Sequence, residues 1–262
     1  MRNSLDLETF PLDQPGSARW QALVDQCRDD LGANGMFNLV GLMRPEVAAR
    51  ESAALAGRFK SEGFLHEREH NIYFQKSIEG LADDHPALSR FQTSNLTLCA
   101  DQLINSALLR LYEWPEFARF LAATMGMAEL HVMADPLARV NAMSYHGGQA
   151  LNWHFDRSEF TTTLLLQAPD SGGEFEYRTD LRDADDPNYD GVAKLLSGGD
   201  DQVQKQHLTP GTLNVFKGRN TAHRVTPVAG PTPRIISVFS YYERPKVMFS
   251  KEERNGFYGR AS

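Results

Sequence analysis

The pattern of apolar residues changes once along the chain, near Leu137, and this change constrains the fold more than any other feature of the sequence. After that point, short runs rich in Val, Leu, Phe and Thr alternate with clusters of Gly, Pro, Asp and Asn. Apolar runs separated by turn residues predict short β-strands. Eight strands are expected, over 137–145, 151–155, 161–167, 173–178, 202–208, 212–216, 223–225 and 234–242. Such a series is typical of a sandwich or a jelly roll.

Before this change, from about Ser17 to Met127, apolar residues recur at helical spacing. Ser17 is a candidate N-cap, Gly32 lies near the expected end of the first helix, and Pro45 suits the first turn of the second. Helices are expected over 17–31, 45–60, 98–112, 115–125 and 188–196, a strand over 36–43, and a strand or loop over 66–74. The sequence therefore predicts an α+β protein in which helices pack on a β-core.

Composition and charge are those of an ordinary globular protein. The chain has 262 residues, of which 41% are hydrophobic, and this is enough to bury a substantial core. The net charge of -7 argues against a nucleic-acid partner or an acidic membrane surface, because both attract a basic face. Two cysteines, Cys27 and Cys99, are too few for a disulfide framework and predict reduced, packed thiols.

Targeting signals are the next feature to consider. Residues 1–15 are polar and acidic and lack the apolar core of a signal peptide. No apolar run reaches the roughly 18 residues that a membrane helix needs. We therefore expect a cytoplasmic protein.

Three residues of the β-rich half have the character of metal ligands. Within Trp153-His154-Phe155-Asp156, His154 and Asp156 are two positions apart, so on a strand both side chains would point to one face. A second histidine, His223, begins a later strand-like run. Two imidazoles and one carboxylate leave the other positions of a metal open, as iron(II) requires when it must also bind a cosubstrate and O2. Manganese, cobalt or zinc could occupy the same donors.

An arginine follows these residues. Arg234 begins another apolar run, and a guanidinium inside a mostly apolar barrel is costly unless an anion accompanies it. A dicarboxylate cosubstrate would satisfy it. Each feature alone has an ordinary alternative, since His-x-Asp is a common tripeptide and an arginine in a strand usually lies at an edge or on the surface. Their shared order and strand context favour a functional site.

Several motifs between Asn141 and Tyr242 are similar to those of the iron(II)/2-oxoglutarate dioxygenase superfamily. These motifs are His154-Phe155-Asp156, Gly172-Gly173-Glu174-Phe175, Pro210-Gly211-Thr212-Leu213, Phe216-Lys217-Gly218, His223-Arg224-Val225 and Arg234. The resemblance implies a double-stranded β-helix, that is, a cupin-like jelly roll, supported by the N-terminal helices. It also implies that the two histidines and Asp156 bind iron(II), that Arg234 holds the far carboxylate of 2-oxoglutarate, and that O2 is the oxidant.

The domain organisation follows from the same resemblance. A single dioxygenase domain is expected over 1–262. Within it, 1–135 would provide mainly helical support and part of the substrate pocket, 136–245 the jelly-roll core, and 246–262 a C-terminal segment.

A narrower resemblance is carried by two further segments. Asn152-Trp153-His154-Phe155-Asp156 and Asn71-Ile72-Tyr73-Phe74 resemble the free-standing amino-acid halogenases and hydroxylases, whose founding members act on lysine. In such halogenases a glycine replaces the carboxylate ligand and opens a site for chloride. Asp156 stands at that position here, which implies hydroxylation, desaturation or ring closure in place of chlorination. Arg157 replaces an acidic residue of the lysine enzymes, which leaves neutral or acidic amino acids as substrates.

Other residues are candidates for the walls of the site. Asn141 and Tyr145 alternate on one strand face and could contact 2-oxoglutarate, although ordinary sheet packing explains them equally well. The polar cluster from His66 to Asn71 could be a lid over the substrate or a solvated loop. The candidate substrate-binding residues are His70, Arg90, Arg157, Ser240 and Tyr258.

Two other readings of the sequence stay open. One keeps the cofactors but changes the outcome to desaturation, cyclisation or action on a carrier-bound substrate. The other is a cupin-like protein that binds a metal or a ligand without oxidising anything. Cupin sites usually draw on more clustered histidines, and only His154 and His223 have the required context here.

Overall fold

The first helix, α1 (Ala18–Asn34), has both of its ends set by local sequence signals. In the computed structural model, which describes all 262 residues, the Ser17 side chain accepts a 3.1 Å hydrogen bond from the backbone N–H of Trp20. The helix continues past Gly32 and ends at Gly35, whose φ of 71° is a left-handed conformation that glycine adopts without strain. Its buried face consists of Trp20, Val24, Cys27 and Leu31.

Most strands belong to one large antiparallel sheet. Its order is β1 (Met36–Leu39), β11 (Leu213–Phe216), β7 (Thr161–Gln167), β14 (Arg234–Phe239), β5 (Val140–Tyr145), β3 (Phe91–Leu98) and β2 (Phe64–His70). Strands from the N-terminal half thus form both edges of the sheet, and strands of the C-terminal half fill its centre.

A smaller antiparallel sheet has the order β10 (Gln204–Gln206), β9 (Phe175–Arg178), β12 (Ala222–Val225) and β6 (Leu151–His154). Side chains from both sheets line one cavity. Two short pairs complete the strands, namely β8 (Ser171–Gly172) with β13 (Val228–Ala229) and β4 (His131–Val132) with β15 (Tyr241–Tyr242).

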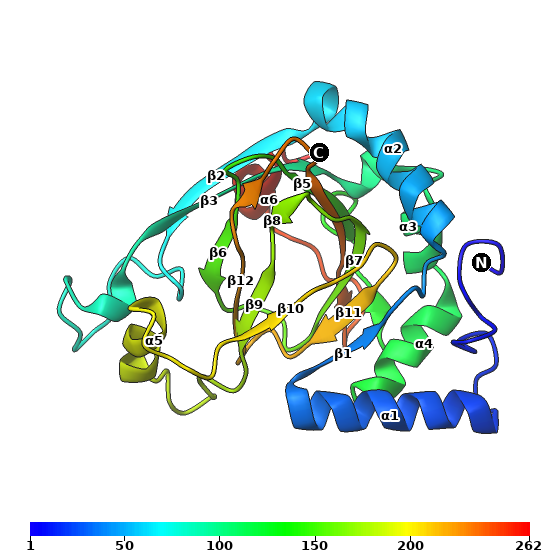
Figure 1. The fold of residues 1–262 in the computed structure, drawn as a ribbon, viewed down its shortest axis with the longest axis horizontal. Coiled ribbons are helices and arrows are strands. Elements are labelled where there is room, and N and C mark those ends of the chain that lie inside the picture. The colour runs from blue at the N-terminus through cyan, green and yellow to red at the C-terminus, as the bar shows by residue number, and fades with distance from the viewer.

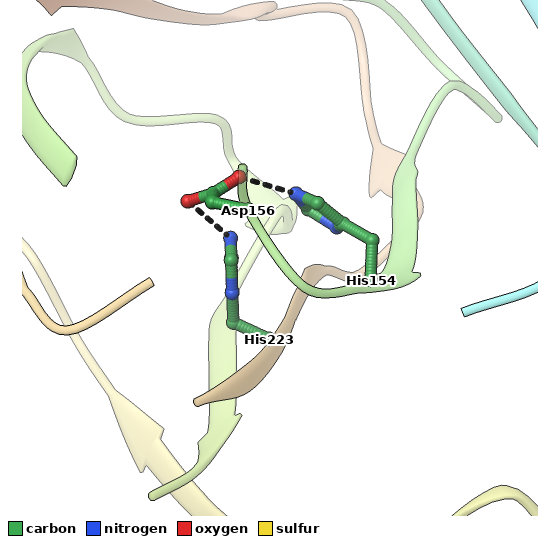
Figure 2. Close-up of side chains that lie close together, drawn as sticks. All are labelled: His154, Asp156 and His223. Atoms are coloured by element: carbon green, nitrogen blue, oxygen red, sulfur yellow. Dashed lines mark ion pairs between the residues drawn. The ribbon is translucent and has the colours of Figure 1, made fainter. Parts of the chain in front are cut away.

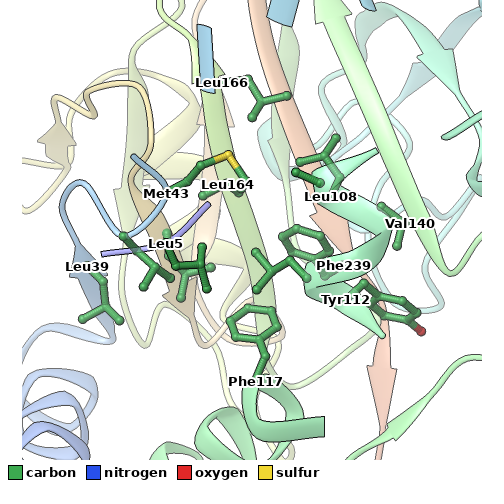
Figure 3. Packing of buried hydrophobic residues seen from close by; sticks show 14 of the residues in the cluster. Leu5, Leu39, Met43, Leu108, Tyr112, Phe117, Val140, Leu164, Leu166 and Phe239 are labelled. Carbon is green, nitrogen blue, oxygen red and sulfur yellow. The ribbon is translucent and has the colours of Figure 1, made fainter. Parts of the chain in front are cut away.

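Four helices cover the outer face of the large sheet (Figure 1). Helix α1 packs on β1, and α4 (Pro115–Thr124) packs on α1. Helix α2 (Pro45–Glu62) packs on β7 and β3, and α3 (Ala107–Tyr112) packs on β5. Figure 3 shows the apolar layer between them, where Leu164 and Phe239 of the sheet meet Tyr112 of α3 and Phe117 of α4. Each such side chain contributes about 1.5–3 kcal/mol when it is fully buried.

Alternation along the strands separates this apolar layer from the cavity. In β14, Ile235 and Phe239 belong to the apolar cluster, whereas Arg234, Ile236 and Val238 line the cavity. Successive side chains of a strand point to opposite faces, so one strand serves both layers. The helices thereby support the sheet from behind while its other face remains available for a site.

The β-rich half agrees closely with the prediction, since each of the eight expected runs contains a strand. The mixed helix-and-strand architecture confirms the α+β class, and the predicted short helix is present as α5 (Tyr189–Leu196), capped by Asn188. Two 3-10 turns, η1 (Pro86–Leu88) and η2 (Ala100–Leu103), and a last helix, α6 (Lys251–Tyr258), complete the chain.

The predicted helix over 98–112 is wrong in its first half. Strand β3 runs to Leu98, the turn η2 follows, and Asn105 adopts a left-handed φ of 68° that no helix can continue through. Helix α3 begins only after Ser106, whose side chain accepts a hydrogen bond from the backbone N–H of Leu109. The segment 66–74 is a strand as far as His70. None of the helices combines the length and apolar character needed to cross a membrane.

Candidate metal centre

The small sheet brings the two candidate histidines together. His154 ends β6, and the antiparallel register pairs it directly with His223 of β12, so both side chains lie on one face. Their ring centroids are 4.1 Å apart and both residues are buried. Asp156 lies two residues beyond the end of β6, where its backbone N–H donates a 3.0 Å hydrogen bond to the carbonyl of Gly218. The carboxylate therefore projects from an anchored turn and not from a continuing strand.

The three side chains converge, as Figure 2 shows. Asp156 Oδ1 lies 3.4 Å from His154 Nε2, and Asp156 Oδ2 lies 3.4 Å from His223 Nε2. One donor atom of each residue lies within 4.8 Å of the others. Two nitrogens and one carboxylate oxygen at these distances form a compact donor set for one metal ion.

Hydrogen bonds fix the orientation of both imidazoles. His154 Nδ1 lies 2.8 Å from the carbonyl of Asn152, and His223 Nδ1 lies 2.9 Å from the carbonyl of Thr221. A carbonyl oxygen only accepts, so Nδ1 carries the hydrogen and each Nε2 presents its lone pair toward Asp156. The backbone thus selects the tautomer that a metal requires.

The charge states of His223 and Asp156 also suit a metal. Burial, followed by repulsion from His154, lowers the pKa of His223 to about 4, so its ring is neutral at physiological pH. Burial opposes ionisation of Asp156, but the neighbouring imidazoles of His223 and His154 and the hydrogen bond from the Thr161 hydroxyl outweigh it and hold its pKa below the usual range. A neutral imidazole and an ionised carboxylate are the forms that bind metals.

Two residues hold the Asp156 side chain in place. The hydroxyl of Thr161, at the start of β7, donates a hydrogen bond to Asp156 Oδ2. Gly218 leaves the space that the carboxylate occupies, because a Cβ at this position would lie 2.3 Å from Oδ2. Thr161 was not among the predicted site residues, since nothing in the sequence places it beside Asp156.

The cavity beside these residues has a volume of about 290 Å³ and also contains Arg234. Arg234 is 2% exposed, and its Nε donates a 3.1 Å hydrogen bond to the carbonyl of Gly173. Its Nη1 is buried without a hydrogen-bond partner. Burial lowers the pKa of Arg234 to about 10, so the side chain stays charged at neutral pH. An unpaired buried guanidinium of this kind is expected to bind an anion.

Asn141 and Tyr145, the two residues predicted to contact 2-oxoglutarate, differ in whether their polar atoms are free to bind a ligand. Asn141 and Tyr145 both line the cavity from β5. The Asn141 amide is engaged within the protein, because its Nδ2 donates to the carbonyls of Leu137 and Val140 and its Oδ1 accepts from the hydroxyl of Tyr258. Tyr145 makes only a 3.6 Å contact with the sulfur of Met143, so its hydroxyl remains available to a ligand.

The structure places three of the five predicted substrate residues on the cavity wall. These are His70, Arg157 and Tyr258. Arg90 lies outside the cavity because it pairs with Glu69 on the opposite face of β2 at 2.5 Å. Ser240 also lies outside, since β14 ends at Phe239 and the Ser240 carbonyl accepts a hydrogen bond from Tyr112 in the helical layer.

Strand β2 contributes three basic side chains to the cavity, of which only His70 was a predicted substrate residue. The segment was expected to be a strand or a loop, with its polar cluster either a lid or solvated, and all of β2 pairs with β3, from Phe64 opposite Thr97 to His70 opposite Phe91. Alternation then directs His66, Arg68 and His70 toward the cavity. The two-residue spacing of these basic side chains was the signal that could have identified them.

Comparison with known proteins places the chain in a family. The model of the family described as Halogenase D matches residues 97–255, which is more than half of the chain. No curated protein sequence matches it.

Solved structures show the same fold at low sequence identity. An oxidoreductase of the 2OG-Fe(II) oxygenase family from Burkholderia pseudomallei is 16% identical with a TM-score of 0.52, over 89% of this chain and 94% of that one. A prolyl-4-hydroxylase from Pseudomonas putida is 15% identical with a TM-score of 0.51, over 83% and 98%. AviO1 from Streptomyces viridochromogenes Tue57 is 20% identical with a TM-score of 0.54, over 85% and 96%.

These likenesses confirm the predicted jelly-roll fold of the 2-oxoglutarate oxygenases. The compact donor set fits iron(II), and the unpaired guanidinium of Arg234 fits the far carboxylate of 2-oxoglutarate. The resemblance inferred from the sequence motifs is thereby confirmed, and the chain belongs to the halogenase D family.

Proposed function

We propose that this protein is an iron(II)- and 2-oxoglutarate-dependent oxygenase that hydroxylates an unactivated C–H bond of a free amino acid or a similar small molecule. The reaction would consume O2 and release succinate and CO2. The observation that carries this proposal is the carboxylate of Asp156, positioned beside the two histidines with its oxygens 3.4 Å from their Nε2 atoms.

His154, Asp156 and His223 would hold the metal, each through one donor atom. When bound, iron(II) with 2-oxoglutarate and O2 supplies the oxidising power that removes hydrogen from an unactivated C–H bond. Arg234 would neutralise the far carboxylate of 2-oxoglutarate, and the Tyr145 hydroxyl beside it can add a hydrogen bond. Asn141 would act mainly by fixing Tyr258 in the wall of the cavity.

Asp156 favours hydroxylation over halogenation in spite of the family name. A halide that binds the metal needs a free position, and a ligating carboxylate occupies that position. The carboxylate accepts a hydrogen bond from the Thr161 hydroxyl, and the backbone N–H of Asp156 is bonded to the Gly218 carbonyl, so the side chain cannot swing aside without losing its bond to Thr161. The cavity of about 290 Å³ suits a small molecule.

The free, buried thiols of Cys27 and Cys99 agree with a reducing compartment, so a cytoplasmic location remains our prediction.

An anaerobic absorbance titration tests the cofactors. Metal-free protein receives iron(II) and then 2-oxoglutarate, and a weak visible charge-transfer band is expected when the cosubstrate chelates the metal. The band should be absent in His223→Ala and present in His207→Ala, which changes an exposed histidine away from the cavity. Absence of the band in folded, iron-loaded wild-type protein would contradict the proposal and favour the cupin-like alternative.

The reaction outcome is tested by product mass. Amino acids are supplied with O2, 2-oxoglutarate and chloride, and succinate release identifies those that are turned over. A product that gains one oxygen atom supports hydroxylation, and Asp156→Ala should abolish it. Loss of two hydrogens would indicate desaturation or ring closure, and gain of chlorine would contradict the role given to Asp156.

A further inference from the structure

Two arginines stand at the mouth of the cavity, and one of them has no anionic partner. Arg68 lines the cavity from β2, with its guanidinium 4.8 Å from the centre of the Phe74 ring. Its guanidinium makes no ion pair and no hydrogen bond within the protein, unlike that of Arg90 on the other face of the same hairpin, which pairs with Glu69. Arg68 is also exposed, so a ligand can reach it from solvent.

The second arginine, Arg157, follows directly after Asp156. Its Nη1 lies 2.7 Å from Glu253 Oε1, and its guanidinium stands 5.7 Å from the centre of the Phe257 ring. Its side chain is 71% exposed. The other oxygen of Glu253 accepts a hydrogen bond from the backbone N–H of Ser250, so this one carboxylate already serves both α6 and Arg157.

The two guanidinium groups are close enough to repel each other. Partial covering of its side chain by the protein, and then the positive charge of Arg157, lowers the pKa of Arg68. Among the residues that line the cavity, Asp156 is the one carboxylate, and it belongs to the candidate metal centre. The mouth of the cavity thus holds excess positive charge. A cationic substrate would find no free counter-charge there, whereas an anion would relieve the repulsion.

Phe74 contacts both the arginine at the cavity mouth and the candidate metal centre. One ring, that of Phe74, lies under Arg68 and also contacts the His154 ring edge-on, with centroids 6.0 Å apart. An anion bound by Arg68 would therefore lie next to a ring that itself contacts one of the candidate metal ligands. A short molecule can thus have its anionic end at the mouth and its C–H bonds toward the metal centre.

From this arrangement we propose that the substrate carries an anionic group besides the α-carboxylate that every amino acid has, a side-chain carboxylate or a phosphate, and that Arg68 binds this group together with Arg157. The inference rests on the proposed oxygenase function and deepens it, because it gives the substrate a charge. Arg68 acts as a specificity-determining residue that binds the group and places the rest of the molecule in the cavity. Arg234, deeper in the cavity, remains with the cosubstrate.

Pairs of compounds, each an acid and its neutral counterpart, test the charge of the substrate. Calorimetry on anaerobic protein loaded with iron(II) and 2-oxoglutarate compares L-glutamate with L-glutamine, L-aspartate with L-asparagine, and O-phospho-L-serine with L-serine. L-Lysine serves as the cationic probe. At least one acid is expected to bind at least tenfold more tightly than its neutral partner and than lysine. The phosphoserine arm shows whether phosphate or carboxylate is preferred.

Variants test the assigned residues. Arg68→Gln and Arg157→Gln should each weaken binding of the preferred acid at least tenfold, and Arg68→Lys should restore part of it. Arg90→Gln is the matched control on the outer face of the hairpin and should bind the acid as the wild type does. Equal or tighter binding of amides or lysine, or unchanged acid binding in Arg68→Gln, would overturn the inference.

The failure of this inference can be told apart from failure of the oxygenase function. The charge-transfer band with 2-oxoglutarate does not depend on Arg68. If the band forms but no acid is preferred, only the charge of the substrate is wrong. If the band never forms in folded protein, the oxygenase function is wrong and the inference falls with it.

Discussion

At the scale of single residues, the hydroxyl of Thr161 presents the Asp156 carboxylate to the metal. Thr161→Val keeps the shape of the side chain but removes the hydrogen bond to Oδ2. Loss of such a partner of a metal ligand typically weakens metal binding about 10–100-fold. Competition with a coloured chelator measures this. Thr162→Val is the control, since this neighbouring residue points away and makes no side-chain hydrogen bond. Wild-type affinity in Thr161→Val would mean that the hydrogen bond from Thr161 does not orient the carboxylate.

His70 should make stability depend on pH. It is buried with Nδ1 against the Asn71 carbonyl and Nε2 against the Thr93 hydroxyl, and burial lowers its pKa to about 4. The unfolded chain binds this proton near pH 6.5, so stability is complete above that pH and falls as the pH drops toward 4. Between pH 7 and 5 the loss is about 2 kcal/mol at most.

Urea unfolding of metal-free protein at pH 7 and pH 5 measures this dependence. His70→Asn should reduce the difference between the two pH values, whereas His207→Asn, at an exposed site, should retain it. An unchanged difference in His70→Asn would show that other groups cause it.

At the scale of elements, strands that are bounded by clear turn residues could be predicted from the sequence. Strands that are recognisable only from their hydrogen-bonded partner strand could not. The run from Thr161 to Gln167 is rich in Thr and Leu and bounded by turn residues, and its strand was expected. β2 alternates charged residues on both faces, so only its pairing with β3 identifies it as a strand. β3 was missed because Thr93, Asn95 and Thr97 face the cavity and make the segment polar. Burial of polar side chains in a site removes the apolar signal on which strand prediction depends.

Helix α6 depends on its first turn. The Ser250 side chain accepts a hydrogen bond from the backbone N–H of Glu253, and the Glu253 side chain accepts one from the backbone N–H of Ser250. Ser250→Ala should cost about 1 kcal/mol, which corresponds to roughly fivefold faster hydrogen exchange of residues 251–258. Ser17→Ala should affect α1 in the same way and leave α6 unchanged. Wild-type exchange in Ser250→Ala would mean that packing of Phe257 and Tyr258 alone maintains the helix.

At the scale of the whole molecule, the sequence predicted the class of the fold and the candidate ligands but not the order of the strands. His154, Asp156 and His223 could be recognised because their spacing and the strand pattern agree. The sequence could not predict that β1, β2 and β3 join β5 and β14 in one sheet, because this depends on contacts between segments far apart in the chain. For the same reason Arg68 could be named only as part of a lid or a solvated cluster, since its side chain reaches the cavity only when β2 joins the sheet edge.

The two sheets contribute different parts of the site, and this predicts how ligands stabilise the fold. The metal ligands come from the small sheet and the turn after it, whereas Arg234 and Tyr145 come from the large sheet. Iron(II) should raise the free energy of unfolding, and 2-oxoglutarate should add a second increment of about 2.7 kcal/mol at 100 times its Kd. In anaerobic urea unfolding, Arg234→Met should keep the first increment and lose most of the second, whereas His223→Ala should lose both. A full second increment in Arg234→Met would mean that the far carboxylate binds elsewhere and that the cosubstrate does not join the two sheets.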